Sequence, residues 1–196
     1  MKKIVYFFIF FFMMGLMLPQ QTYAQKKVMS QKEIRKIDKK KRKQARLKAS
    51  LKSRVYYANL LKKHYFVFQA DQLYGPGGRS FPVSPTINFL AVVKNKVILQ
   101  FGFDGVMGWN GVGGLTAEGF LKNYKFYPGK TVKKALMISS NISPRGGGST
   151  PYLTMTVNND GYAYLDIIMG RRGKITMSGQ IVAPSQSSVF KGQTLY

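Results

Sequence analysis

The chain contains no cysteine, and this absence excludes several classes of protein at once. Without cysteine there is no disulfide, no thiolate metal site and no cysteine nucleophile. A bacterial lipoprotein is excluded as well, because its lipid is attached through a cysteine. The 196 residues must therefore depend on a hydrophobic core, and an apolar content of 45% is sufficient for one.

Side chains that commonly carry out catalysis are scarce. There are seven acidic residues and one histidine, His64, which lies where a helical pattern changes to an extended one. Asp104 and Glu118 are the one plausible pair of carboxylates for hydrolysis, but Asp104 precedes a glycine, as is typical of a turn. No calcium-loop spacing is present. We therefore expect a protein that is not an enzyme and that holds no metal or cofactor.

Residues 1–24 have the pattern of a signal peptide. Two lysines are followed by fifteen uncharged, mostly apolar residues, and Ala24 supplies a small residue at the cleavage position. An uncleaved membrane anchor is the alternative, but the run is shorter than the ~20 residues that a spanning helix needs. We expect cleavage after Ala24 and a periplasmic or secreted protein.

Positive charge is concentrated near the N-terminus of the mature chain. Residues 26–63 contain sixteen Lys and Arg against two acids, whereas residues 64–196 contain thirteen against five. The segment 35–54 alone has eleven basic residues against a single acid, Asp38. The electrostatic field of the protein therefore arises mainly from this segment.

The same segment is predicted to be a long helix, within a helical extension that covers residues 25–63. It has no proline or glycine from Ser30 to Leu61, and Ser30 followed by Glu33 matches a capping box. Apolar residues recur at spacings of three and four: Ile34, Ile37, Leu47, Leu51, Val55, Ala58 and Leu61. We expect the half from Leu47 onward to pack through this stripe.

After His64 the apolar period changes from 3.6 to 2. The clearest hairpin joins residues 152–157 to residues 162–169 through Asn159-Asp160-Gly161. Seven or eight short strands with turns between them predict an all-β domain over residues 64–183, either an antiparallel sandwich or a small barrel. Residues 184–196 are polar, and we expect a flexible tail there.

The β domain resembles a secreted bacterial family, domain of unknown function 4251. The resemblance covers about residues 58–182. It rests on these segments, in order: Phe66–Asp71, Asn88–Leu90, Gly113-Gly114, Glu118-Gly119, Tyr124, Gly161–Leu165 and Ile175–Ile181. It implies an exported protein with a charged helix before a β domain, and it implies no activity. The length and positive charge of the helix exceed what the resemblance leads us to expect.

Two places are candidates for binding. The basic helix presents Lys39, Lys40, Lys41, Arg42, Lys43 and Arg46. It is either a solvated helix, a docking element for anionic surfaces such as lipid head groups, lipopolysaccharide or acidic glycan, or a nucleic-acid binder. Nucleic acid is disfavoured, because export removes the protein from cytoplasmic nucleic acid and aromatic residues for stacking are missing until Tyr56. The oligomeric state is left open.

The second candidate is the glycine-rich segment around Trp109, the only tryptophan, and Asn110. A flexible loop that carries an aromatic residue can form the mouth of a ligand pocket, although Trp109 can equally fold back onto the core. We expect an exported envelope protein that docks electrostatically to anionic partners through the helix. The alternative is a small-molecule or glycan pocket near Trp109, with the helix as a spacer.

Overall fold

The computed structural model describes residues 30–75, 78–102, 111–170 and 173–192. Helix α2, Gln31–Lys62, precedes nine strands, and no other α-helix occurs among these residues. The chain divides into two compact units, residues 1–41 and residues 42–196, with the boundary inside α2. Every strand belongs to the second unit.

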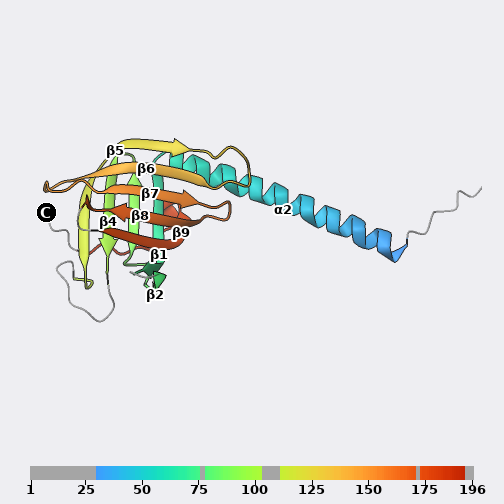
Figure 1. The fold of residues 1–196 in the computed structure, drawn as a ribbon, viewed down its shortest axis with the longest axis horizontal. Coiled ribbons are helices and arrows are strands. Elements are labelled where there is room, and N and C mark those ends of the chain that lie inside the picture. The colour runs from blue at the N-terminus through green and yellow to red at the C-terminus, as the bar shows by residue number, and fades with distance from the viewer. Residues whose placement is uncertain (1–29, 76–77, 103–110, 171–172, 193–196) are drawn as a thin grey trace, which may run out of the picture. The chain divides into compact units, whose positions relative to one another are not determined.

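The strands form one antiparallel sheet (Figure 1). They are β1 (Tyr65–Tyr74), β2 (Ser80–Pro82), β3 (Phe89–Val93), β4 (Lys96–Phe101), β5 (Leu115–Tyr127), β6 (Leu136–Pro144), β7 (Tyr152–Val157), β8 (Tyr162–Ile168) and β9 (Lys174–Val182). The predicted hairpin is confirmed as β7 and β8, with Met155 opposite Leu165. Gly161 has a φ of 88°, which the turn requires and which glycine adopts without strain.

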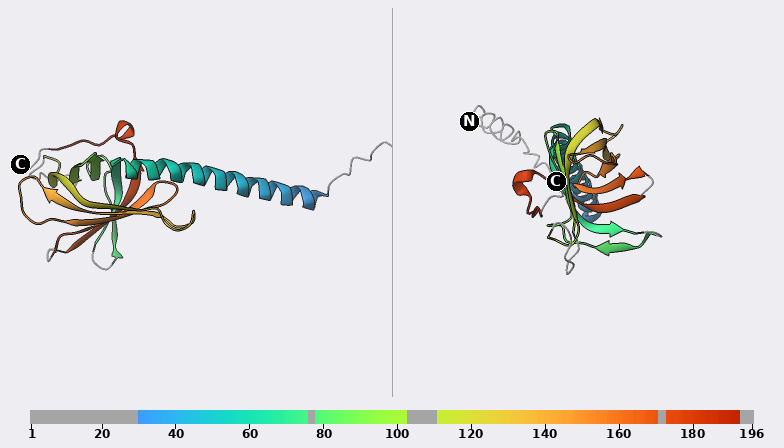
Figure 2. Two further views of the ribbon diagram at one scale, coloured as in Figure 1. Left: turned by 90° about the horizontal axis from the view of Figure 1, so that it is seen from above. Right: turned by 90° about the vertical axis from the view of Figure 1, so that its left-hand side faces the viewer.

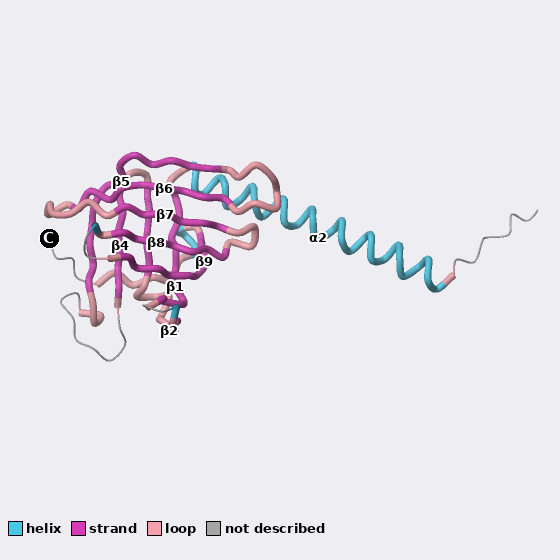
Figure 3. The backbone as a smooth tube through the Cα atoms, viewed as in Figure 1, coloured by secondary structure: helices cyan, strands magenta, loops and turns pink. Residues whose placement is uncertain are grey.

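The sheet closes on itself because its first long strand pairs with its last. Strand β1 pairs with β9 from Val67 opposite Val182 to Tyr74 opposite Thr176, and a register shift lies between Ala70 and Gln72. Eight strands therefore form a closed barrel, and β2 is an extra strand on β1 (Figure 3). The all-β prediction is confirmed, and of its two alternatives the barrel is formed. Closure removes the exposed strand edges that an open sheet would present.

The interior of the barrel is filled by alternate side chains of the strands. These inward residues are almost fully buried: Phe66, Phe68, Leu90, Val92, Ile138, Leu153, Met155, Leu165, Ile167, Met177 and Ile181. An eight-stranded barrel is just wide enough for side chains to fill it. The barrel is therefore built around a packed core.

The C-terminal turn of α2 completes this core. Leu61 is fully buried and Leu60 is nearly so, and both belong to the barrel's hydrophobic cluster. Tyr124 of β5 donates a hydrogen bond of 2.8 Å from its hydroxyl to the carbonyl oxygen of Leu61. Burial raises the pKa of Tyr124, so the hydroxyl keeps its proton to a higher pH than an exposed tyrosine does. The end of the helix is thus part of the domain.

Residues 184–192, which we call the C-terminal strap, run along the outside of the barrel (Figure 2). The strap begins with a short 3-10 helix, Pro184–Gln186. The Phe190 amide donates to the Thr86 carbonyl at 2.8 Å, and Gln69 donates to the Ser188 hydroxyl at 3.3 Å. The polar sequence predicts a flexible tail here. In its described part the tail is instead hydrogen-bonded to strand β1 and to the turn before β3.

Candidate functional site

The capping box of helix α2 forms as its sequence predicts. The backbone amide of Ser30 donates to the Glu33 carboxylate at 3.0 Å, and the amide of Lys32 donates to the Ser30 hydroxyl at 3.3 Å. These bonds satisfy backbone donors that a helix start leaves without partners. The helix then continues for 32 residues with thirteen Lys and Arg against Glu33 and Asp38.

All six predicted anion-binding residues lie on α2, and all six are exposed. Within the second unit, Arg42 and Lys43 precede Arg46 by four and three residues, so these three share one face of the helix. Within the part of the chain that the structure describes, none of the six forms an ion pair with an acidic residue. Their charges are therefore directed to solvent or to a partner.

The predicted packing stripe of the helix is wrong in its first part. Leu47, Leu51 and Val55 are 54%, 39% and 59% exposed, and only Ala58 and Leu61 pack against the barrel. Apolar spacing alone suggested that all five would be buried. The helix instead docks through a different face, and polar side chains determine which face that is.

Arg54 is the centre of this docking face. Its guanidinium donates to the carbonyl oxygen of Lys134 at 2.6 Å, to Oδ1 of Asn159 at 2.9 Å and to the carbonyl oxygen of Pro128. Asn159 in turn donates to the hydroxyl of Ser50 at 3.0 Å. A planar guanidinium with several donors suits such a cluster of carbonyl acceptors. In the sequence, Arg54 cannot be distinguished from the other basic residues of the helix.

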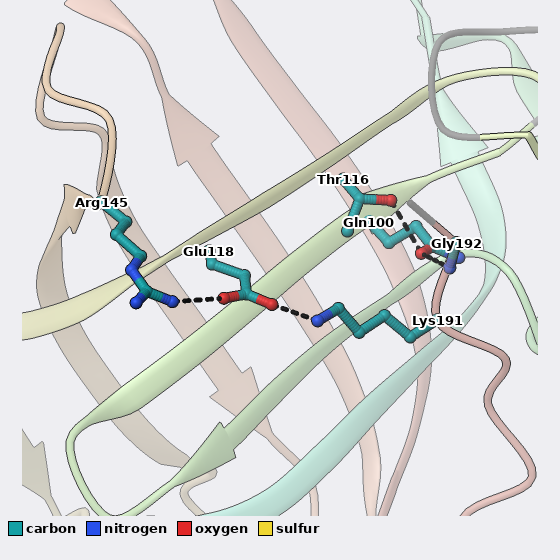
Figure 4. A network of polar contacts seen from close by, with 6 residues as sticks. All are labelled: Gln100, Thr116, Glu118, Arg145, Lys191 and Gly192. Atoms are coloured by element: carbon teal, nitrogen blue, oxygen red, sulfur yellow. Dashed lines mark hydrogen bonds and ion pairs between the residues drawn. The ribbon is translucent and has the colours of Figure 1, made fainter. Parts of the chain in front are cut away.

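Asp104 and Glu118 are the candidate catalytic pair from the sequence. The structure describes only Glu118, because Asp104 lies outside the described residues. Glu118 projects from the outer face of β5 and is held by two cations (Figure 4). Lys191 of the strap donates to Oε1, and Arg145 Nη1 lies 3.6 Å from Oε2. Its surroundings are those of a structural ion pair that anchors the strap.

Gln100 provides a second anchor for the strap, beside Glu118 (Figure 4). Its Oε1 accepts hydrogen bonds of 2.8 Å from the Thr116 hydroxyl and from the Gly192 amide. Its Nε2 donates to the carbonyl oxygen of Phe190 at 2.8 Å. Gln100 is fully buried, and these bonds satisfy both ends of its amide. The polar composition of the tail does not indicate any of these contacts.

The pKa of Glu118 leads to a testable pH dependence. The hydrogen bond from Lys191, with the charges of Lys191 and Arg145, lowers this pKa below its ordinary value of 4.5 although partial burial acts in the opposite direction. A carboxylate with a depressed pKa contributes stability above its unfolded pKa and loses it as the pH falls through the folded pKa. Stability should therefore fall more steeply in the wild type than in Glu118→Gln between about pH 5 and pH 3.

Urea unfolding at a series of pH values measures this difference. Lys191 contributes most to the lowered pKa of Glu118. Lys191→Gln should therefore have a pH dependence of stability close to that of Glu118→Gln. Parallel pH profiles for wild type and Glu118→Gln would show that the carboxylate does not anchor the strap.

The remaining candidates from the sequence have no catalytic geometry among the described residues. His64 adopts a positive φ of 50° at the junction of α2 and β1, and its ring contacts that of Tyr124 with 4.0 Å between centroids and a tilt of 50° between planes. Trp109 and Asn110 lie outside the described residues, so the predicted ligand mouth stays a prediction. In the described chain no group of three His, Asp or Glu residues is placed to hold a metal ion.

A shallow depression of about 290 Å³ occurs on the outer face of the barrel between β4 and β5. It is lined by Lys96, Val97, Ile98, Glu118, Gly119, Phe120 and Arg145. Two of its charged residues, Glu118 and Arg145, already neutralise each other in part.

Among the described helices, none combines the length and the apolar character that crossing a membrane requires.

Comparison with known proteins agrees with this architecture. Residues 48–181 match the model of a domain of unknown function, DUF4251. A crystal structure of a DUF4251 family protein from Bacteroides eggerthii DSM 20697 is similar, with a TM-score of 0.58 and 26% identity over 70% of this chain and 92% of that chain. No curated protein matches the chain. Because the family model matches more than half of its residues, the chain belongs to the DUF4251 family.

Proposed function

We propose that this protein is an exported, non-enzymatic binding or accessory protein of the bacterial cell envelope, and that helix α2 docks it to anionic partners. The observation that carries the proposal is the exposed, unpaired basic surface of the helix. Twelve of the thirteen Lys and Arg residues of the helix are exposed, Arg54 being the exception, and none of the twelve forms an ion pair with an acidic residue within the described chain.

Such an arrangement is unfavourable for the helix itself. Lys39 and Lys43 are four residues apart, as are Arg42 and Arg46, and like charges at this spacing each cost about 0.2–0.5 kcal/mol. An anionic partner would remove this repulsion. Each Lys or Arg near an anionic surface contributes roughly 1 kcal/mol, so a few engaged residues suffice to hold the protein there.

The proposal is tested with the purified protein and four probes: heparin, lipopolysaccharide, duplex DNA and vesicles that contain phosphatidylglycerol. Binding is measured at about 50 mM and about 500 mM salt, which shortens the screening length from roughly 14 Å to roughly 4 Å. We expect tight binding to at least one non-nucleic probe at low salt, and its loss at high salt. Substituting Lys39, Lys40, Lys41, Arg42, Lys43 and Arg46 by Gln should weaken it by roughly a hundredfold or more.

A matched pair of variants separates a specific site from net charge. Lys40→Gln/Lys41→Gln/Lys43→Gln and Arg79→Gln/Lys96→Gln/Lys122→Gln each remove three exposed positive charges. Only the first set should weaken binding substantially. Equal losses would mean that the net charge of the protein acts without a site. Absence of binding to every probe at low salt would leave the helix as a solvated element.

The alternative function is a small-molecule or glycan pocket near Trp109, with the helix as a spacer. Trp109 is the only tryptophan, so its fluorescence would report such a ligand directly. A fluorescence change that is insensitive to salt and unaffected by the six substitutions in α2 would favour the pocket over electrostatic docking.

A further inference from the structure

The exposed part of the apolar stripe on α2 is a contiguous surface. Leu47, Leu51 and Val55 follow one another at intervals of four residues, so their side chains are neighbours on one side of the helix. All three lie in the unit that contains the barrel, and all three are at least 39% exposed. Single exposed aliphatic residues are ordinary, but a contiguous apolar strip within a highly charged helix indicates an interaction surface.

Lysines flank this strip on the helix itself. Lys48 and Lys52 each follow a leucine of the strip by one residue, and both are exposed. Their long aliphatic stems can lie along an apolar surface while their ammonium groups stay in a polar layer. The strip therefore has cationic groups immediately beside it.

A second set of lysines comes from the connection between β5 and β6. Arg54 fixes this connection to the helix through its hydrogen bonds to the carbonyl oxygens of Pro128 and Lys134. Arg54 follows Leu47 by seven residues, about two helical turns, so the docked face adjoins the strip and the connection lies at the strip's edge. Lys130, Lys133 and Lys134 in this connection are all exposed.

We call Leu47, Leu51 and Val55, together with these five lysines, the basic-apolar face. A second copy of this chain is a poor occupant for it, because two strongly positive helices repel each other. A soluble polyanion would neutralise the lysines but would leave the three aliphatic side chains in water. An occupant that satisfies both has dense negative charge at its surface and hydrocarbon directly beneath.

We propose that the basic-apolar face docks onto the surface of an anionic phospholipid bilayer. Leu47, Leu51 and Val55 enter the boundary between head groups and acyl chains, and the lysines contact lipid phosphates. Tyr127, which is 41% exposed and directly precedes Pro128, adds an aromatic side chain of the kind that favours this boundary. This inference rests on the proposed function and names its partner.

The binding experiment compares phosphatidylcholine vesicles, with and without about one-third phosphatidylglycerol, at about 150 mM salt, where surface charges are screened beyond roughly 8 Å. We expect Leu47→Ser/Leu51→Ser/Val55→Ser to bind the anionic vesicles roughly tenfold or more weakly than the wild type. The same variant should bind heparin within about twofold of the wild type, because its charge is unchanged. Thermal unfolding verifies that the exposed substitutions leave the fold intact.

A matched control uses Val93, Leu115 and Ile168, which are 40%, 39% and 41% exposed on the barrel. Their replacement by Ser removes similar apolar surface elsewhere, and vesicle binding should be unchanged. Lys130→Gln/Lys133→Gln/Lys134→Gln leaves the helix untouched and should weaken vesicle binding several-fold. Equal losses in the control and the strip variant would overturn the inference.

The absence of cysteine permits a second readout that does not depend on affinity. Leu51→Cys and, as control, Val93→Cys each create a single attachment point for an environment-sensitive fluorophore. We expect the emission at position 51 to shift to the blue when anionic vesicles are added, and the emission at position 93 to stay constant. An unchanged emission at position 51 in vesicle-bound protein would show that the strip does not enter the bilayer.

The outcomes separate this inference from the proposed function. Binding to heparin or lipopolysaccharide without binding to anionic vesicles would overturn the bilayer and leave the proposed function in place. Capture of an acidic protein, with no vesicle binding, would also overturn the bilayer. Absence of binding to every polyanion would overturn both, and equal binding to neutral and anionic vesicles would overturn the role of the lysines.

Discussion

Replacing Gly179 by alanine should destabilise the barrel more than any other single methyl addition that we consider. Gly179 in β9 pairs with Ala70 of β1 and with Ala163 of β8, so three small residues adjoin at the seam that closes the barrel. A Cβ atom at position 179 would lie 1.9 Å from the carbonyl oxygen of Gln69 and 2.8 Å from the Cα atom of Ala70. Both contacts are with backbone, so no side-chain rotation relieves them.

We expect Gly179→Ala to lower the free energy of unfolding by about 3 kcal/mol or more, because overpacking against a fixed backbone separates the two strands. For a domain of this size the melting temperature should fall by about 10 °C. Urea and thermal unfolding followed by circular dichroism measure both. If the variant is expressed as insoluble protein while the wild type is soluble under the same conditions, the substitution prevents folding, which is a larger destabilisation than the one expected.

Gly147→Ala is the control for a glycine substitution. Gly147 has a φ of 80° and open space around its Cα atom, so alanine there meets no atom within 4 Å. We expect a cost of about 1 kcal/mol, from the backbone conformation alone. If Gly179→Ala costs no more than Gly147→Ala, β1 and β9 do not approach as closely as the barrel requires.

The second large effect is expected at the end of helix α2. Leu61 is fully buried in the barrel's core, and the hydroxyl of Tyr124 is bonded to its carbonyl oxygen. Leu61→Ala removes a buried side chain from a closed core and leaves a cavity, for which losses of about 2–5 kcal/mol are usual. We expect about 3 kcal/mol, measured as the free energy of unfolding in urea.

Leu51→Ala is the matched substitution on the same helix. Because Leu51 is exposed, its replacement should change the free energy of unfolding by less than about 0.5 kcal/mol. A large loss for Leu51→Ala would mean that the apolar stripe packs against the barrel as its spacing predicts. Similar small effects for both variants would mean that the helix end is not part of the core.

The two leucines also mark the limit of prediction from periodicity. Spacings of three and four residues correctly place Leu61 and Ala58 on the packed side of α2, but they place Leu47, Leu51 and Val55 there as well. The helix is instead held through Ser50 and Arg54, which bond to the β5–β6 connection and to Asn159. Those partners lie about 80 and 105 residues further along the chain, and no local pattern refers to them.

In the candidate sites, too, some features follow from the sequence and others depend on tertiary contacts. Composition alone places six cationic side chains on a helix, and the structure confirms that all six are exposed. The predicted site does not include the lysines of the β5–β6 connection, because only tertiary contacts bring residues 128–134 against Arg54. That Glu118 anchors the strap is likewise not indicated by the sequence, because its partner Lys191 comes from a polar tail that is predicted to be flexible.

By itself, the sequence determined the features that arise within a few residues of one another. Helix α2 with its capping box, the alternation of the strands and the Asn-Asp-Gly hairpin all depend on local backbone bonding and on period. The absence of cysteine chemistry follows from composition. The tertiary structure decided the closure of the barrel, the docked face of α2 and the path of the strap. Each of these depends on hydrogen bonds or packing between segments that are distant in sequence, where many pairings satisfy the same local pattern.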